Sequence, residues 1–124
     1  MKLFTIEEAN SILPDVGVKL RKIQRLYSMV GVLKEPAQKA AAASNFGGGM
    51  EGGSEYVRSL YEIGKITTEL NADGIQLKDY SNGLIDFPSM RDGRIVLLCW
   101  KLGEPEFIEW WHEVETGFAG RQPL

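Results

Sequence analysis

The sequence predicts an α+β domain, with an N-terminal helical hairpin packed on an antiparallel β-meander of about four strands. In the first half of the chain, apolar residues recur at alternating spacings of four and three, which is typical of helices that pack along a narrow seam. In the second half, short apolar or alternating runs are separated by turn residues such as Asn-Gly and Asp-Gly, which favour β-hairpins. A chain of 124 residues is long enough for a single domain with its own core.

The composition of the chain indicates which partners and which cellular location to expect. The net charge is −3, from 14 basic and 17 acidic residues, so we expect no nucleic-acid partner. No apolar run reaches the length that spans a bilayer, so we expect no membrane association. The chain has one cysteine, which cannot form an internal disulfide, and this favours a cytoplasmic location.

Helical structure is predicted first over residues 5–43. Thr5 and Glu8 have the spacing of a capping box, in which each side chain accepts a hydrogen bond from the backbone of the other residue. Because a proline inside a helix removes a hydrogen bond and clashes with the preceding turn, we expect Pro14 to begin a second helix after a short first one. The apolar seam consists of Ala9, Leu13, Val16, Leu20, Ile23, Tyr27 and Val30.

A glycine-rich segment follows the first helical region. Residues 45–53 contain five glycines, which disfavour regular structure and predict a flexible loop. The segment lacks the lysine and the Ser/Thr of a phosphate-binding loop. The next helix is predicted over residues 54–73, with a seam of its own, and Gly74 is placed to terminate it. Two helices with matching seams pack antiparallel, and seams of this length also favour a homodimer.

The region 75–115 is predicted to form the antiparallel sheet. The turn residues between its strands set their registers, which place Asp86 opposite Lys78 on one side and opposite Ile95 on the other. Ile95 in turn faces His112, so these four residues form one row on one face of the sheet. The same registers predict two further cross-strand pairs, Arg94 with Glu113 and Trp100 with Phe107. The predicted strands are residues 75–80, 84–87, 94–101 and 106–114, and the tail 116–124 has no clear pattern.

The predicted row is the place in this chain where chemistry is expected. A histidine near a carboxylate is a general acid–base unit or half of a metal site, so His112 and Asp86 are candidate ligands of a divalent metal ion. The alternative is a hydrogen-bonded histidine at a sheet edge, beside a structural ion pair. Cys99 lies in the middle of a strand and is expected to be a small core residue rather than a nucleophile. The metal-binding spacings HExxH and CxxC do not occur.

Three strings in the sequence resemble a small bacterial family of unknown function. They are FTIEEANSILP, then GIQLKD with YSNGLIDFPS, and finally GRIVLLCWKLGEP with FIEWWHEVETGFAGRQP. The resemblance spans the chain and brings no activity with it, but it implies a set of signature residues: Asp86, Arg94, Trp100, Glu104, His112, Gly117 and Arg121. Among these, we take as candidate ligand-binding residues Asp86, Arg94, Trp100, Glu104 and Arg121.

Two functional hypotheses follow from these observations. The first is a small cytoplasmic domain that binds a small ligand or a metal ion at the C-terminal sheet. The second is a non-catalytic interaction or oligomerisation module built on the helical hairpin. The sequence leaves open the identity of the ligand and whether the domain is an enzyme, because a fold does not by itself specify an activity.

Overall fold

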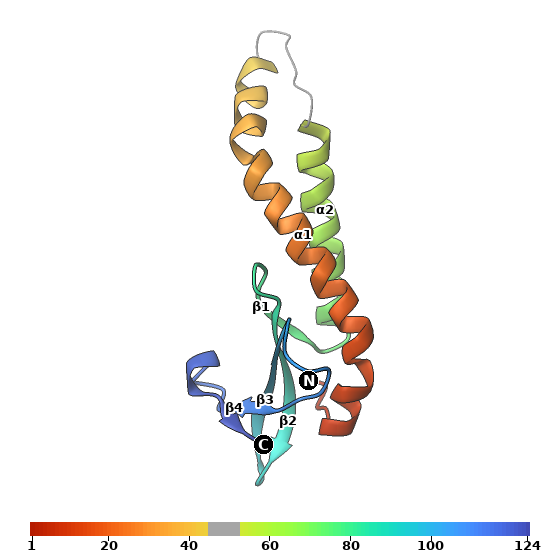
Figure 1. Ribbon diagram of the computed structural model, residues 1–124, viewed down its shortest axis with the longest axis vertical. Coiled ribbons are helices and arrows are strands. Elements are labelled where there is room, and N and C mark those ends of the chain that lie inside the picture. The colour runs from red at the N-terminus through yellow and green to blue at the C-terminus, as the bar shows by residue number, and fades with distance from the viewer. Residues whose placement is uncertain (45–52) are drawn as a thin grey trace.

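The computed structural model describes residues 1–44 and 53–124 and shows two helices followed by an antiparallel sheet (Figure 1). Helices α1 (Ile6–Ser44) and α2 (Gly53–Ala72) lie side by side and run in opposite directions. The predicted α+β architecture is confirmed, with the N-terminal helices packed on the sheet. The predicted loop over residues 45–53 lies, except for Gly53, outside the described residues.

The sheet has five strands in the order β1-β2-β3-β4-β5, and all neighbouring pairs are antiparallel. Four of them correspond to the predicted meander, and the fifth is a short strand in the tail, where no strand was predicted. Their bounds are β1 Gln76–Asp79, β2 Leu84–Arg91, β3 Arg94–Lys101, β4 Trp110–His112 and β5 Gln122–Pro123.

The first helix begins at the predicted capping box and does not break where predicted. The backbone N–H of Thr5 donates to Glu8 Oε1, and the N–H of Glu8 donates to Thr5 Oγ1, both at 3.0 Å. Pro14 lies within the continuous α1, so the prediction that it starts a second helix is wrong. The proline is on the exposed side, while its neighbours Leu13 and Val16 are buried in the core. Their burial offsets the missing hydrogen bond, because packing overrides local propensity.

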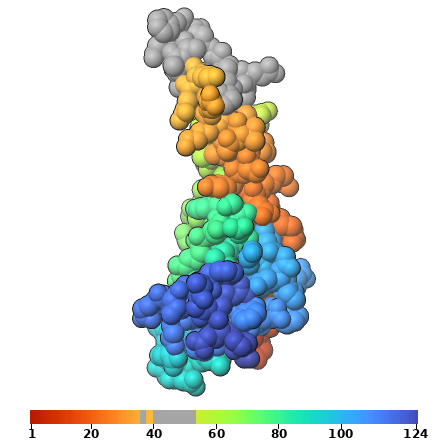
Figure 2. Space-filling model, turned by 60° about the vertical axis from the view of Figure 1, so that its left-hand side comes forward, coloured from red at the N-terminus to blue at the C-terminus, as the bar shows by residue number. Residues whose placement is uncertain are grey.

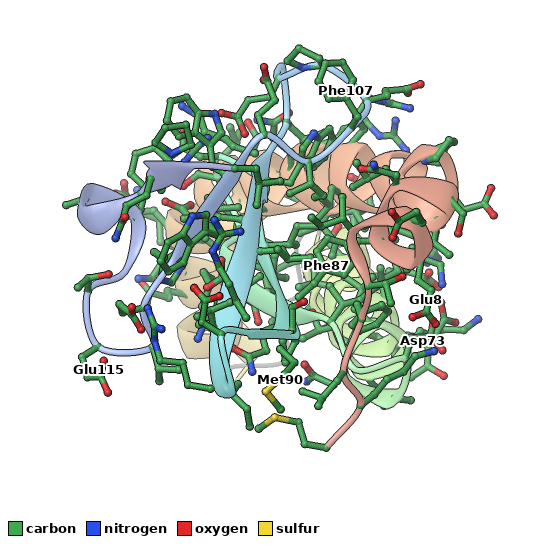
Figure 3. The ribbon with its side chains drawn as sticks, turned by 90° about the horizontal axis from the view of Figure 1, so that it is seen from below. Glu8, Asp73, Phe87, Met90, Phe107 and Glu115 are labelled. Atoms are coloured by element: carbon green, nitrogen blue, oxygen red, sulfur yellow. The ribbon has the colours of Figure 1, made fainter. Side chains whose placement is uncertain are left out.

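The core lies between the helices and one face of the sheet. Phe87 points from β2 toward the helices (Figure 3) and meets the Phe4 ring edge-on, with 5.1 Å between the centroids. The N-terminal segment is also bound to β2 through its backbone, since the N–H of Phe4 donates to the Pro88 carbonyl at 2.7 Å and Ser89 Oγ donates to the Phe4 carbonyl at 2.6 Å. Above the sheet, the two helices continue together as an extended arm (Figure 1).

The opposite face of the sheet points away from the helices and carries Asp86, Cys99 and His112. The C-terminal residues follow β4 and return along it, because β5 pairs with β4 at the edge of the sheet, and they form the dark blue surface in Figure 2. This segment contains the short helix η1 (Phe118–Gly120) and β5, and its Leu124 N–H donates to the Glu109 carbonyl at 3.0 Å. The C-terminal segment therefore extends the sheet by one short strand at its β4 edge.

The predicted strand registers are wrong, although the predicted face is right. Asp86 pairs with Cys99 rather than Ile95, and His112 pairs with Leu97 rather than Ile95. Across β1, Asp86 pairs with Gln76 rather than Lys78. These shifts are of four, two and two residues, and an even shift keeps a side chain on the same face because strand side chains alternate.

The cause of the largest shift is the turn between β2 and β3. The turn is a tight two-residue turn of Asp92 and Gly93, with φ of 51° and 78°, which brings Arg91 opposite Arg94. The prediction assumed a longer loop from Pro88. The fourth strand is also shorter than predicted, because residues 102–109 form a loop. The predicted pairing of Trp100 with Phe107 is consequently wrong.

Candidate functional site

Three side chains from neighbouring strands meet on the outer face of the sheet. Asp86 is on β2, Cys99 is directly opposite it on β3, and His112 is on β4, opposite the residue two before Cys99. One oxygen, one sulfur and one nitrogen from these residues lie within 4.8 Å of one another. The sheet thus brings together three atoms of the kinds that bind metal ions.

All three residues are inaccessible to solvent. Asp86 and His112 are each 2% exposed, and Cys99 is fully buried. Burial of a charged carboxylate is unfavourable unless it is paired. Asp86 Oδ1 lies 3.1 Å from His112 Nε2, which supplies that partner inside the protein.

The second ring nitrogen of His112 determines what must lie between His112 Nε2 and Asp86. His112 Nδ1 lies 2.7 Å from the carbonyl oxygen of Glu113, and because a carbonyl only accepts hydrogen bonds, Nδ1 carries a hydrogen and donates it. Without a second proton, Nε2 would direct its lone pair at a carboxylate oxygen, which is repulsive. The short distance between Nε2 and Asp86 therefore requires a proton or a metal ion between the two atoms.

Cys99 in this environment is a neutral thiol. Burial, followed by the negative charge of Asp86, raises the pKa of the Cys99 thiol to about 12. Reactive cysteines show the opposite shift. A catalytic triad would also need a ring nitrogen facing the thiol, whereas the two nitrogens of His112 face Asp86 and a carbonyl. The arrangement does not fit a cysteine nucleophile activated by His112.

An ion pair lies beside these three residues. Arg121 Nη2 is 2.6 Å from Glu104 Oε2, and Glu104 Oε1 accepts a hydrogen bond of 2.8 Å from the backbone N–H of Lys101. The guanidinium of Arg121 lies 4.8 Å from the centroid of the Trp110 ring and 4.7 Å from that of Phe118. The charges of Arg121 and Glu104 also act, in opposite directions, on the pKa of the Cys99 thiol, so the pair is close to the buried cluster.

The structure divides the sequence-predicted site residues between the two faces. It joins Asp86 to His112, and it joins Glu104 to Arg121 on the same outer side. It places Trp100 in the core against the helices, with its Nε1 donating to the Pro105 carbonyl at 2.7 Å. Arg94 lies at the turn end of β3, where its side chain pairs with that of Glu113, with 3.1 Å between Arg94 Nε and Glu113 Oε1, although the two residues are not opposite each other in the observed register.

Cys99 is the residue of the cluster whose role the sequence did not indicate. It is buried, as expected of a core residue, but it lies beside two candidate metal ligands. The Asp92-Gly93 dipeptide is the sequence feature from which the position of Cys99 beside Asp86 could have been predicted. If that dipeptide alone is taken as the turn, pairing strands outward from it brings Cys99 opposite Asp86.

Comparison with known proteins gives a family and no function. Within residues 1–44 and 53–124, neither helix has the length and apolar character needed to cross a bilayer. Neither the curated proteins nor the solved structures contain a significant match to the chain. A family model described as an uncharacterized conserved protein matches nearly the whole sequence. The chain therefore belongs to the DUF2203 family, whose model covers residues 2–124.

Proposed function

We propose that this domain binds a divalent transition-metal ion, of the zinc type, through Asp86, Cys99 and His112. The observation that carries the proposal is the pair formed by His112 Nε2 and Asp86 Oδ1, which lie 3.1 Å apart and need a proton or a metal ion between them. The Cys99 thiol lies next to this position and could supply a third ligand. A bacterial cytoplasm, where thiols stay reduced, is the location we propose for such a site.

The chemistry of the three donors favours zinc over magnesium or calcium. Zinc binds cysteine sulfur, histidine nitrogen and carboxylate oxygen at about 2.0–2.3 Å, whereas the harder ions prefer oxygen ligands throughout. The hydrogen bond from His112 Nδ1 to the Glu113 carbonyl is the outer contact that usually orients a metal-bound histidine. Binding requires the three donors to approach to roughly 3–4 Å of one another, as those bond lengths imply.

The direct test is titration of the purified, reduced protein with Zn²⁺ and with Co²⁺. We expect one ion per chain by calorimetry, and for Co²⁺ we expect the charge-transfer absorption of a thiolate ligand. The variants Asp86→Asn, Cys99→Ala and His112→Ala should each weaken binding, and Cys99→Ala should also remove the charge-transfer band. Glu115→Gln is the matched control, because Glu115 is exposed and points away from the sheet (Figure 3).

The proposal fails if neither ion binds to folded wild-type protein. In that case the three variants would have a lower free energy of unfolding, and the role of the buried pair would be to stabilise the fold. Binding that survives all three substitutions would place the metal elsewhere in the chain.

A second candidate function is supported by a different observation. Three apolar side chains on one side of α2, spaced as neighbours on a helix surface, are exposed: Val57 (64%), Leu60 (45%) and Tyr61 (67%). We propose that this side of α2 pairs with a second copy to form a homodimer, which would make the arm an interaction module. Light scattering at micromolar concentration should then give twice the mass of the chain, and Tyr61→Glu should give the monomer mass. A monomer mass for the wild type would refute this role.

A further inference from the structure

The C-terminal segment, residues 117–124, which we call the strap, lies next to the buried cluster, because its β5 pairs with β4 and its Arg121 pairs with Glu104. Its short helix η1 contains no buried residue, and both residues of β5 are exposed. Phe118 and Leu124 are also exposed, so the strap has little apolar anchorage of its own. Within residues 1–44 and 53–124, its backbone pairs with the rest of the domain through the two-residue β5 and the hydrogen bond from the Leu124 N–H to the Glu109 carbonyl.

Arg121 is the residue that holds the strap most firmly. Its side chain is 9% exposed, pairs with Glu104 and contacts the rings of both Trp110 and Phe118. Trp110 is the β4 partner of Cys99, and Glu104 is in the loop that follows β3. The anchor of the strap is therefore attached to residues that adjoin the thiol.

The strap begins at a glycine whose backbone few other residues could adopt. Gly117 has φ 67° and ψ −164°, a combination almost restricted to glycine. A Cβ added at Gly117 would meet no atom, so the requirement comes from the backbone conformation rather than from crowding. The segment after Gly117 can change direction at a point that carries no packed side chain.

We propose that the strap opens about Gly117 and controls access to the Asp86–Cys99–His112 cluster. The Arg121–Glu104 ion pair stabilises the closed position. For metal ions, this proposal rests on the proposed function, because the strap can control the entry of an ion only if the cluster binds one. For the Cys99 thiol it does not, since the proposed gate would also limit the access of a maleimide reagent to the buried sulfur. Opening is a local event that exposes the outer face of the sheet and leaves the helix-facing core intact.

The experiment measures the rate at which N-ethylmaleimide alkylates native protein, followed by intact mass. Cys99 is the single cysteine of the chain, so each mass increase reports this site. Arg121→Ala should raise the alkylation rate at least tenfold above that of the wild type. Glu104→Gln should also raise the alkylation rate. Glu104→Gln keeps the size of the side chain and an oxygen for the Lys101 N–H. Arg58→Ala, which removes an exposed arginine on α2, should leave the rate unchanged.

Urea distinguishes opening of the strap from unfolding of the whole domain. At low urea, the faster alkylation of Arg121→Ala should depend only weakly on denaturant, because local opening exposes little surface. If the rate instead rises with the full denaturant slope of global unfolding, or if both variants react at the wild-type rate, the gate is refuted. Glu104→Gln keeps the test valid if Arg121→Ala does not fold.

Stopped-flow mixing with Co²⁺ separates failure of the gate from failure of the metal site. If both hold, Arg121→Ala should speed association and dissociation together and change Kd less than threefold. If Co²⁺ does not bind but alkylation is accelerated, the strap stands and the metal proposal fails. If Co²⁺ binds at the same rate in all variants and alkylation is unchanged, the metal site stands and the strap is refuted.

Discussion

His112 Nε2 lies 3.1 Å from Asp86 Oδ1 although the two residues are on strands that are not neighbours. The strand β3 runs between β4, which carries His112, and β2, which carries Asp86. The residue that β3 presents beside them is Cys99, whose side chain is short enough for the other two to meet across the strand. The same residue that could bind a metal ion therefore also leaves the space in which the pair forms.

Removal of both members of the buried pair should lower the free energy of unfolding by less than the two single removals added together. His112→Ala leaves the Asp86 carboxylate buried without a partner, and breaking such a pair costs about 3–5 kcal/mol of unfolding free energy. The double variant Asp86→Ala/His112→Ala should lose clearly less than the sum of the two single variants. Urea unfolding of the four proteins in the presence of a chelator measures this coupling, and additive losses would show that the two side chains do not interact.

Zinc binding should release the thiol proton of Cys99. Because the pKa of this thiol is raised to about 12, the sulfur carries its proton throughout the neutral range and must lose it to bind the ion. Affinity should therefore increase as pH rises. Calorimetry in two buffers with different ionisation enthalpies gives the number of protons released, and the number for Cys99→Ala should be smaller by one. An equal number for both proteins would argue against a zinc–sulfur bond.

Arg94→Ala should leave metal binding unchanged, in contrast to its place among the sequence-predicted ligand residues. Arg94 lies at the turn end of β3 and pairs with Glu113, which raises the pKa of Arg94 and lowers that of Glu113. The pair is on the surface, so we expect a small loss of melting temperature that disappears in high salt. A large loss of zinc affinity in Arg94→Ala would mean that the site extends to this end of the sheet.

Asp79 should stabilise the β1–β2 turn in a pH-dependent way. Its carboxylate accepts hydrogen bonds from the side chain and backbone of Asn82 and from Ser81, and these lower its pKa from 3.8 to about 2. A lowered pKa in the folded state means that the contribution is complete above pH 3.8 and is lost as the pH falls through about 2. The melting temperature of Asp79→Ala should therefore lie below that of the wild type at pH 6, by a difference that shrinks toward pH 2.

Asp15→Asn controls for the removal of one negative charge from the exposed surface in the Asp79 experiment. A difference between wild type and Asp79→Ala that stays constant from pH 6 to pH 2 would contradict the assignment. So would an Asp79 carboxyl resonance, followed by NMR, that titrates near pH 4.

Local rules accounted for the parts of the fold that depend on nearest neighbours. The Thr5–Glu8 capping box involves residues three apart, and the face of Asp86 and His112 follows from the alternation of side chains along a strand. An even error of register left that face unchanged. This is why the sequence could predict that Asp86 and His112 share a surface without predicting their correct partners.

The remaining features depend on contacts between residues far apart in the chain. Pro14 stays within α1 because Leu13 and Val16 beside it are buried in the core. The role of Cys99 depends on the register that the Asp92-Gly93 turn imposes, and the fifth strand exists only because the tail returns to β4. The contacts of Pro14's neighbours and of β5 are not encoded in the local pattern of residues, whereas the register at Cys99 could have been taken from the Asp92-Gly93 turn alone.

The attachment of Phe4 to Pro88 and Ser89 has a consequence for how the chain folds as it is made. The hydrogen bond between Ser89 and Phe4 joins residues 85 positions apart. At about 5–20 residues per second, a ribosome needs roughly 4–17 seconds to synthesise that stretch. That stretch contains α1 and α2, so both helices are made before the strands that cover their apolar sides. The nascent chain is thus most exposed to aggregation, or to capture by a chaperone, before β2 appears.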